Sequence, residues 1–155
     1  MAFMAGRGAR ASAALLATLL TAGCASDSER LPAACLDDPA TIERALERAP
    51  AAVTLAGGTR LSTCVRRARS DTDLQTLGAS LTKVADSLSA RAPRDGAAAL
   101  RLGYLRGATR RGAAANPGLA ANLGRRLEQT TLLRRGSAAA RAALGRGLRA
   151  GEEDG

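Results

Sequence analysis

Apolar residues recur every three to four positions in several segments of the chain, which is the period of an amphipathic helix. The clearest apolar stripe lies between Asp71 and Pro93, and it consists of Leu74, Leu77, Leu81, Val84, Ala85 and Leu88. An earlier stripe begins at Asp38-Pro39, where Asp suits the N-cap and Pro the first helical position, and it ends at Pro50. The pattern therefore predicts one helix between Asp38 and Pro50 and a longer one that starts at Asp71 or Thr72.

Three more helices are predicted around these two. Ser62 is expected to cap a short helix that carries Cys64, and Asp95 to cap a helix with an apolar arc at Leu100, Tyr104, Leu105 and Ala108. Gly103 and Gly107 lie beside this arc and predict the close approach of a neighbouring helix. Charged residues interrupt the segment, which excludes the membrane dimerisation motif of the same spacing. Another helix follows Asn116-Pro117-Gly118 and has leucines at positions 119, 123 and 127.

Two segments have weaker patterns. Residues 53–55 and 59–61 flank Gly57-Gly58 and fit either a short hairpin or an extended loop. After Gly136 the chain is rich in Ala, and Gly145 and Gly147 lower its helix propensity. We therefore predict an all-α fold, a small helical bundle of four to five helices with one disulfide over residues 36–135, followed by a weakly helical or disordered Arg/Ala-rich tail over 136–155.

Composition narrows the chemistry that such a bundle can perform. Ala, Gly and Arg fill 76 of the 155 positions, and the chain has no His or Trp, one Lys, one Tyr and one Phe. Most metal sites, a Ser-His or Cys-His nucleophile pair and an aromatic stacking platform are thereby excluded. Ser80 and Lys83 have the S-x-x-K spacing of penicillin-binding enzymes, but the further Lys of that class is missing. We expect no catalytic activity, no cofactor and no metal.

The N-terminal segment predicts export. Residues 1–10 contain Arg7 and Arg10 and no acid, and residues 11–22 form a stretch of Ala, Leu, Thr and Ser. Twelve such residues are too few for a membrane-spanning helix and suit the apolar region of a cleaved signal peptide.

The end of this signal, Leu19-Leu20-Thr21-Ala22-Gly23-Cys24, resembles the lipobox of bacterial lipoproteins, although Thr21 stands where that family usually has Leu. The resemblance implies cleavage of residues 1–23, lipid attachment to Cys24 with palmitate-type chains, a tether over 24–35, and a protein anchored to the membrane at the cell envelope. The remainder is similar in overall pattern to small lipoproteins of high-GC bacteria, which implies no particular activity. The alternatives are an ordinary secretory signal with a coincidental cysteine, and an N-terminal segment that is not cleaved or does not mark the true start.

If Cys24 is acylated, Cys35 and Cys64 remain as one pair in a compartment where disulfides persist. A disulfide between these two cysteines would close a loop of roughly 30 residues and stabilise the fold by about 3 to 4 kcal/mol. The alternative is a reactive thiol at Cys64, close to Arg66 and Arg67.

Positive charge is concentrated in the second half of the chain. Between Arg91 and Arg149 there are 13 arginines and two acids, and the arginines include three adjacent pairs: Arg110 and Arg111, Arg125 and Arg126, Arg134 and Arg135. Export excludes nucleic acid as the partner, so we expect these six residues to be candidates for binding anionic lipid or wall polymer. The alternative is that Arg serves only as a solubilising surface cation in a GC-rich genome, and that the bundle is a structural or protein-interaction subunit of an envelope complex.

Overall fold

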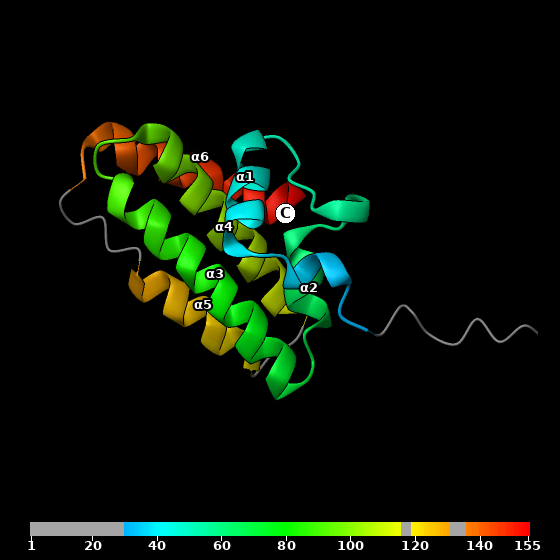
Figure 1. The fold of residues 1–155 in the computed structure, drawn as a ribbon. Coiled ribbons are helices and arrows are strands. Elements are labelled where there is room, and N and C mark those ends of the chain that lie inside the picture. The colour runs from blue at the N-terminus through cyan, green and yellow to red at the C-terminus, as the bar shows by residue number, and fades with distance from the viewer. Residues whose placement is uncertain (1–29, 116–118, 131–135) are drawn as a thin grey trace, which may run out of the picture.

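The computed structural model describes residues 30–115, 119–130 and 136–155. These residues form six α-helices and no named strand, which confirms the all-α class, although the prediction was four to five helices (Figure 1). The helices are α1 (Pro39–Ala45), α2 (Leu61–Arg67), α3 (Asp71–Arg91), α4 (Gly96–Ala114), α5 (Leu119–Thr130) and α6 (Ala138–Asp154). Short 3-10 turns lie at Ala33–Leu36, Leu46–Arg48 and Ala56–Gly58.

The four longer helices run alternately up and down, so that α4 and α6 point the same way with α5 reversed between them along the chain (Figure 1). α4 is the central helix, because it packs against α2, α3, α5 and α6. Ten of its residues are buried, and they lie on most of its circumference. α1 packs against α3, and α2 packs against α4 at the end of the bundle where the C-terminus lies.

Capping residues set most of the helix starts. Asp38 accepts from the Thr41 amide at 3.1 Å, and Asp95 accepts from the Ala97 amide at 2.8 Å, as the sequence predicted. The Thr41 hydroxyl and amide also hold the pKa of the Asp38 carboxyl below its ordinary value. α3 begins at Asp71, as predicted, with Ser70 as its cap.

The predicted role of Ser62 as a cap is wrong. α2 begins at Leu61 with Arg60 at the N-cap position, so Ser62 lies inside the helix. Its buried hydroxyl donates instead to the main-chain oxygen of Gly155, which joins α2 to the last residue of the chain.

The stripe along α3 packs as predicted. Leu77, Leu81, Val84 and Leu88 are buried, whereas Leu74 is only partly buried. The segment before α2 is an extended loop with a single bridge between Thr54 and Arg60, and not a full hairpin. Gly57 and Gly58 turn this loop with φ values of 64° and 72°, in the left-handed region that favours glycine.

A buried hydrogen bond fixes this loop to the central helix. The Val53 amide donates to the Tyr104 hydroxyl at 2.9 Å, and both side chains are fully buried. Tyr104 is the largest fully buried side chain, and its polar end thus satisfies a main-chain donor that would otherwise lack a partner. Burial raises the pKa of its phenol above the ordinary value.

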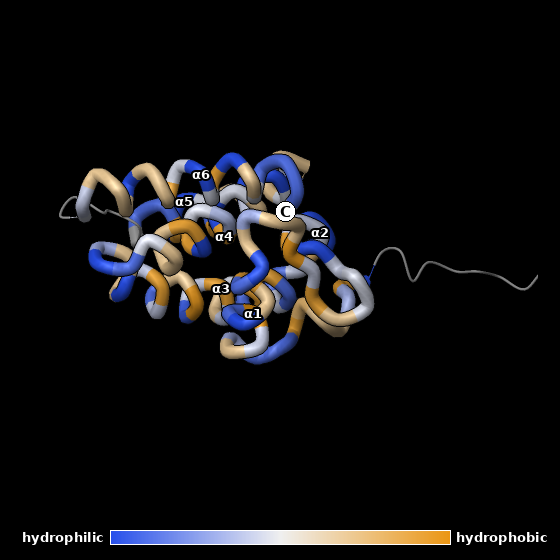
Figure 2. The backbone as a smooth tube through the Cα atoms, turned by 90° about the horizontal axis from the view of Figure 1, so that it is seen from above, coloured by the Kyte–Doolittle hydropathy of each residue, from blue (hydrophilic) through white to orange (hydrophobic). Residues whose placement is uncertain are grey.

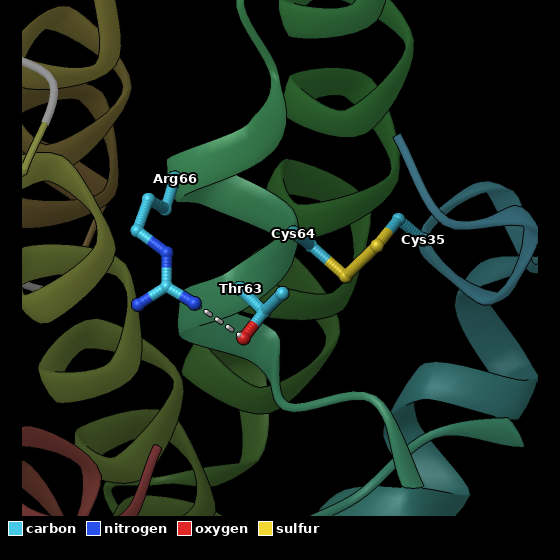
Figure 3. Close-up of a disulfide and its surroundings, with 4 residues drawn as sticks. All are labelled: Cys35, Thr63, Cys64 and Arg66. Carbon is cyan, nitrogen blue, oxygen red and sulfur yellow. Dashed lines mark hydrogen bonds between the residues drawn. A yellow bond between two sulfur atoms is a disulfide. The ribbon is translucent and has the colours of Figure 1, made fainter. Parts of the chain in front are cut away.

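The predicted disulfide between Cys35 and Cys64 is present, and both cysteines are fully buried (Figure 3). It ties the turn Ala33–Leu36 to α2, with the two Cα atoms 5.4 Å apart. The last residues of the predicted tether are therefore part of the fold. Arg66, next to this link, donates to the Thr63 hydroxyl of its own helix at 3.2 Å (Figure 3).

Residues 138–154 differ most from expectation, because they form the 17-residue helix α6 where a weakly helical or disordered tail was predicted. Figure 2 shows pale and strongly hydrophilic positions alternating along it, so a broad apolar face does not hold this helix in place. α6 instead makes the most extensive helix–helix contact in the described structure, with α4.

Glycines on both helices make this contact possible. Gly103 and Gly107 of α4 lie against the backbone of α6 at Leu144 and Leu148, as the glycine spacing predicted. Gly147 and Gly151 of α6 lie in turn against the backbone of α4 at Leu100 and Tyr104. A Cβ atom at any of these four glycines would overlap a carbonyl oxygen of the other helix. Residues whose helix propensity is low thus allow the packing that stabilises the helix.

We expect Gly147→Ala to destabilise the fold by about 1 to 3 kcal/mol or more, because the added methyl group overlaps the backbone of α4. Gly145→Ala is the matched control on the same helix, since its Cβ would meet only the Arg149 side chain at 3.8 Å. This control should be neutral or stabilise by up to about 1 kcal/mol, because Ala favours a helix over Gly. Urea unfolding followed by circular dichroism measures both, and equal changes would contradict the close contact.

We expect the Tyr104 phenol to titrate above its ordinary pKa in the folded chain and at about 10 in denaturant. The folded state then holds the proton more tightly, so stability from this group is present below pH of about 10 and decreases as the pH rises further. The chain has a single Tyr, so tyrosinate absorbance reports this group alone. Tyr104→Phe removes the signal, and a native midpoint at or below the denatured one would contradict the burial.

Candidate functional site

The structure describes four of the six candidate arginines and divides them into two groups. Arg110 and Arg111 lie near the end of α4, whereas Arg125 and Arg126 lie on the exposed face of α5. Arg134 and Arg135 lie outside the described residues, as does Cys24, the predicted lipidation site.

The first pair holds the end of α6. Arg110 Nη1 lies 3.0 Å from Glu152 Oε1, and Arg111 Nη1 donates to the main-chain oxygen of Glu152 at 2.9 Å and also to that of Glu153. The last carbonyl groups of a helix lack partners within the helix, and cations near them are favourable. Arg110 and Arg111 therefore stabilise the contact between α4 and α6, and the Ser62–Gly155 hydrogen bond continues this contact to α2.

The second pair lines an open groove of about 990 Å³ between α3 and α5. The α3 side of the lining comprises Asp71, Leu74, Gln75, Gly78, Ala79, Thr82 and Lys83, and the α5 side comprises Asn122, Leu123, Arg125, Arg126 and Gln129. The α3 residues span twelve positions, which is about 18 Å along a helix. The groove is thus long enough for an extended ligand.

Helical spacing explains how the same two helices provide both core and groove. Leu77 and Leu81 of α3 and Leu123 and Leu127 of α5 are buried in the bundle. Lys83, Arg125 and Gln129 each follow one of these leucines by two positions, are exposed and line the groove. Gly78 lies close to Leu123, since a Cβ atom there would be 3.5 Å from the Leu123 Cδ1 atom.

Positive charge dominates the groove. Among the described residues, three cations line it, Lys83, Arg125 and Arg126, and Asp71 is the single carboxylate. Arg125 also donates to the Asn122 side-chain oxygen, one helical turn away. The remaining polar groups are amides and a hydroxyl, which can donate and accept hydrogen bonds without adding charge.

A half-buried cation of α4 interacts with a carboxylate of α5. Arg106 is half-buried, and its Nε atom has no hydrogen-bond partner. Burial lowers the pKa of this guanidinium, while the negative charge of Glu128 on α5 acts in the opposite direction. Glu128 of α5 therefore interacts with Arg106 of α4. Arg125 and Arg126, also on α5, line the groove.

Lys83 lines the groove but is not among the residues that the sequence predicts for anion binding, because there it stands out only through the S-x-x-K spacing. Its place on the polar side of the α3 stripe follows from the sequence. The sequence does not predict that α5 lies beside α3 and so brings Arg125 and Arg126 to the same groove. Within the described ranges, no three His, Cys, Asp or Glu residues are grouped so that they could hold a metal ion.

Comparisons with known proteins give no further assignment. No protein-family model matches the chain, no curated protein is significantly similar to it, and no solved structure gives a significant match. In the part of the chain that the structure describes, no helix has the length and apolar character needed to cross a membrane.

The division of the arginines predicts different effects on stability. Arg111→Ala should destabilise the fold by about 1 kcal/mol, because main-chain oxygens at the end of α6 lose a charged donor. Arg125→Ala removes the same charge from α5, where the guanidinium donates to the Asn122 side chain of its own helix, and should change stability by less than about 0.5 kcal/mol. Urea unfolding measures both, and equal effects would show that Arg111 does not hold α6.

Proposed function

We propose that the chain is an exported, lipid-anchored and non-catalytic binding module that engages anionic components of the cell envelope through the arginine-rich second half of its domain. The observation that carries this proposal is the groove between α3 and α5, where three cations and one carboxylate line the same open space. The lipobox-like residues that end at Cys24 support the anchor and the location.

The distance between the anchor and the fold is short. Eight residues separate Cys24 from Ala33, where the first turn of the described fold begins. The nine steps from one Cα atom to the next along this segment span at most about 30 Å. A domain tethered in this way stays close to the membrane surface, where each Arg held near anionic lipid contributes roughly 1 kcal/mol within a Debye length.

The charge in the groove also has the right chemistry for such partners. Arg presents a planar set of donors that can bind a phosphate or carboxylate through two parallel hydrogen bonds, and Lys acts as a compact point charge. Neither requires a cofactor or a titrating group. The groove can therefore bind an anion without performing a reaction on it.

A second candidate is a structural or protein-interaction subunit of an envelope complex. It is favoured by the apolar part of the same groove, Leu74, Ala79 and Leu123, against which a helix of a partner protein would pack. In that case the cations around the groove would serve mainly solubility.

The proposal is tested on the mature chain, first as isolated from its envelope and then as a Cys24→Ser variant without lipid. Mass spectrometry should find acyl chains on Cys24. The variant should bind vesicles of anionic lipid or anionic wall polymer, with an affinity that decreases as the salt concentration rises. Vesicles of zwitterionic lipid are the control for charge.

Binding that is absent or insensitive to salt would contradict the anionic partner. Recovery of one defined protein by crosslinking in the native envelope would then favour the interaction subunit. An unmodified Cys24 in the exported protein would contradict the anchor.

A further inference from the structure

The shape of the groove distinguishes between anionic partners. It is a concave space between two neighbouring helices, and the α3 side of its lining is about 18 Å long. A flat bilayer surface contacts the rim of such a groove but not the residues within it, such as Gly78 and the buried Leu123. A single extended chain contacts both.

The charges in the groove fit a ligand with separated anionic groups. Lys83 belongs to α3, and Arg125 and Arg126 belong to α5, so cations approach the groove from both sides. The three cations, less the negative charge of Asp71, leave two positive charges, which can neutralise about two oxyanions. A ligand that follows the full length of the groove must therefore alternate anionic groups with neutral segments.

The neutral lining indicates the chemistry of those segments. Gln75, Thr82, Asn122 and Gln129 offer amide and hydroxyl groups to hydroxyl partners, and Leu74 and Ala79 offer apolar surface to carbon atoms. None of the described residues that line the groove is aromatic, so this lining offers no stacking surface of the kind that binds the faces of sugar rings. Short hydroxylated carbon units match this lining better than a run of sugar rings.

We propose that the groove between α3 and α5 binds one linear polyanion in which phosphodiester groups alternate with short polyol units. This inference rests on the proposed function and names its ligand class. The phosphodiesters contact Lys83, Arg125 and Arg126, and the polyol units lie along the amides and the apolar surface.

The test uses the unacylated mature chain that begins at position 24, with Cys24→Ser and the disulfide formed, and purified poly(glycerol phosphate) as the probe. The groove variant combines Lys83→Ala, Arg125→Ala and Arg126→Ala. The matched control combines Arg44→Ala, Arg146→Ala and Arg149→Ala, which removes the same charge from exposed positions outside the groove. The groove variant should bind the polymer about tenfold or more weakly than the control.

A second variant tests the shape without changing the charge. Ala79 is exposed and lines the groove, so Ala79→Phe fills the space and should weaken polymer binding while the fold, followed by circular dichroism, is unchanged. This variant keeps the test decisive even if the triple substitution alters the stability of α5.

Other outcomes of the binding measurements would overturn the groove, the phosphodiester class or the proposed function. Equal polymer binding by the groove variants and the control, or binding to anionic vesicles alone, would overturn the groove as the site while leaving the proposed function in place. Equally strong binding of polygalacturonate, a carboxylate polymer, would overturn the phosphodiester class. Absence of binding to every anionic probe would overturn both this inference and the proposed function.

Discussion

Four glycines allow α4 and α6 to approach until the backbone of each helix contacts that of the other, and the positions of the later elements depend on this contact. The two helices are parallel, so the chain must return between them, and α5 provides the return (Figure 1). α5 then lies against α3 and α4, and its outward face forms one side of the groove. With few large apolar side chains on α6, a wider spacing of these helices would leave little to hold it, because dispersion attraction decreases steeply with distance.

The same contact explains why two adjacent pairs of arginines, which look alike in the sequence, lie in different surroundings. Arg110 and Arg111 are adjacent to the end of α6 because the parallel register brings the last turns of α4 and α6 together. Arg111 donates to main-chain carbonyl groups that the helix itself cannot satisfy, and Arg110 pairs with the Glu152 carboxylate. Arg125 and Arg126 lie on a helix whose polar face turns away from the bundle. Charge density along the sequence therefore indicates where cations are concentrated, but tertiary structure decides which of them face a ligand.

Local rules predicted much of the fold. The capping by Asp38 and Asp95, the stripe from Leu77 to Leu88 and the close approach at Gly103 follow from spacing and helix propensity alone. The same rules failed for α6, because propensity counts Gly147 as unfavourable and carries no information about the facing helix. They failed for Ser62 because its partner, Gly155, lies 93 residues later in the chain. The groove could be predicted only in part, since Lys83 and Arg125 are brought together by a packing arrangement that neither helix specifies by itself.

The charged side chains of the surface proposed for binding are not part of the core, although Leu123 belongs both to the core and to the lining of the groove. The disulfide joins the turn at Ala33–Leu36 to α2, and Ser62 of α2 donates to Gly155 after α6, so the turn is linked to the helices of the bundle. The groove uses the outward faces of α3 and α5, while their inward leucines supply the core. A ligand in the groove would therefore replace water at polar side chains without moving the apolar residues beneath them. Because the core is thin, this separation allows the groove to change in sequence with a smaller effect on stability than a change at the glycines between α4 and α6.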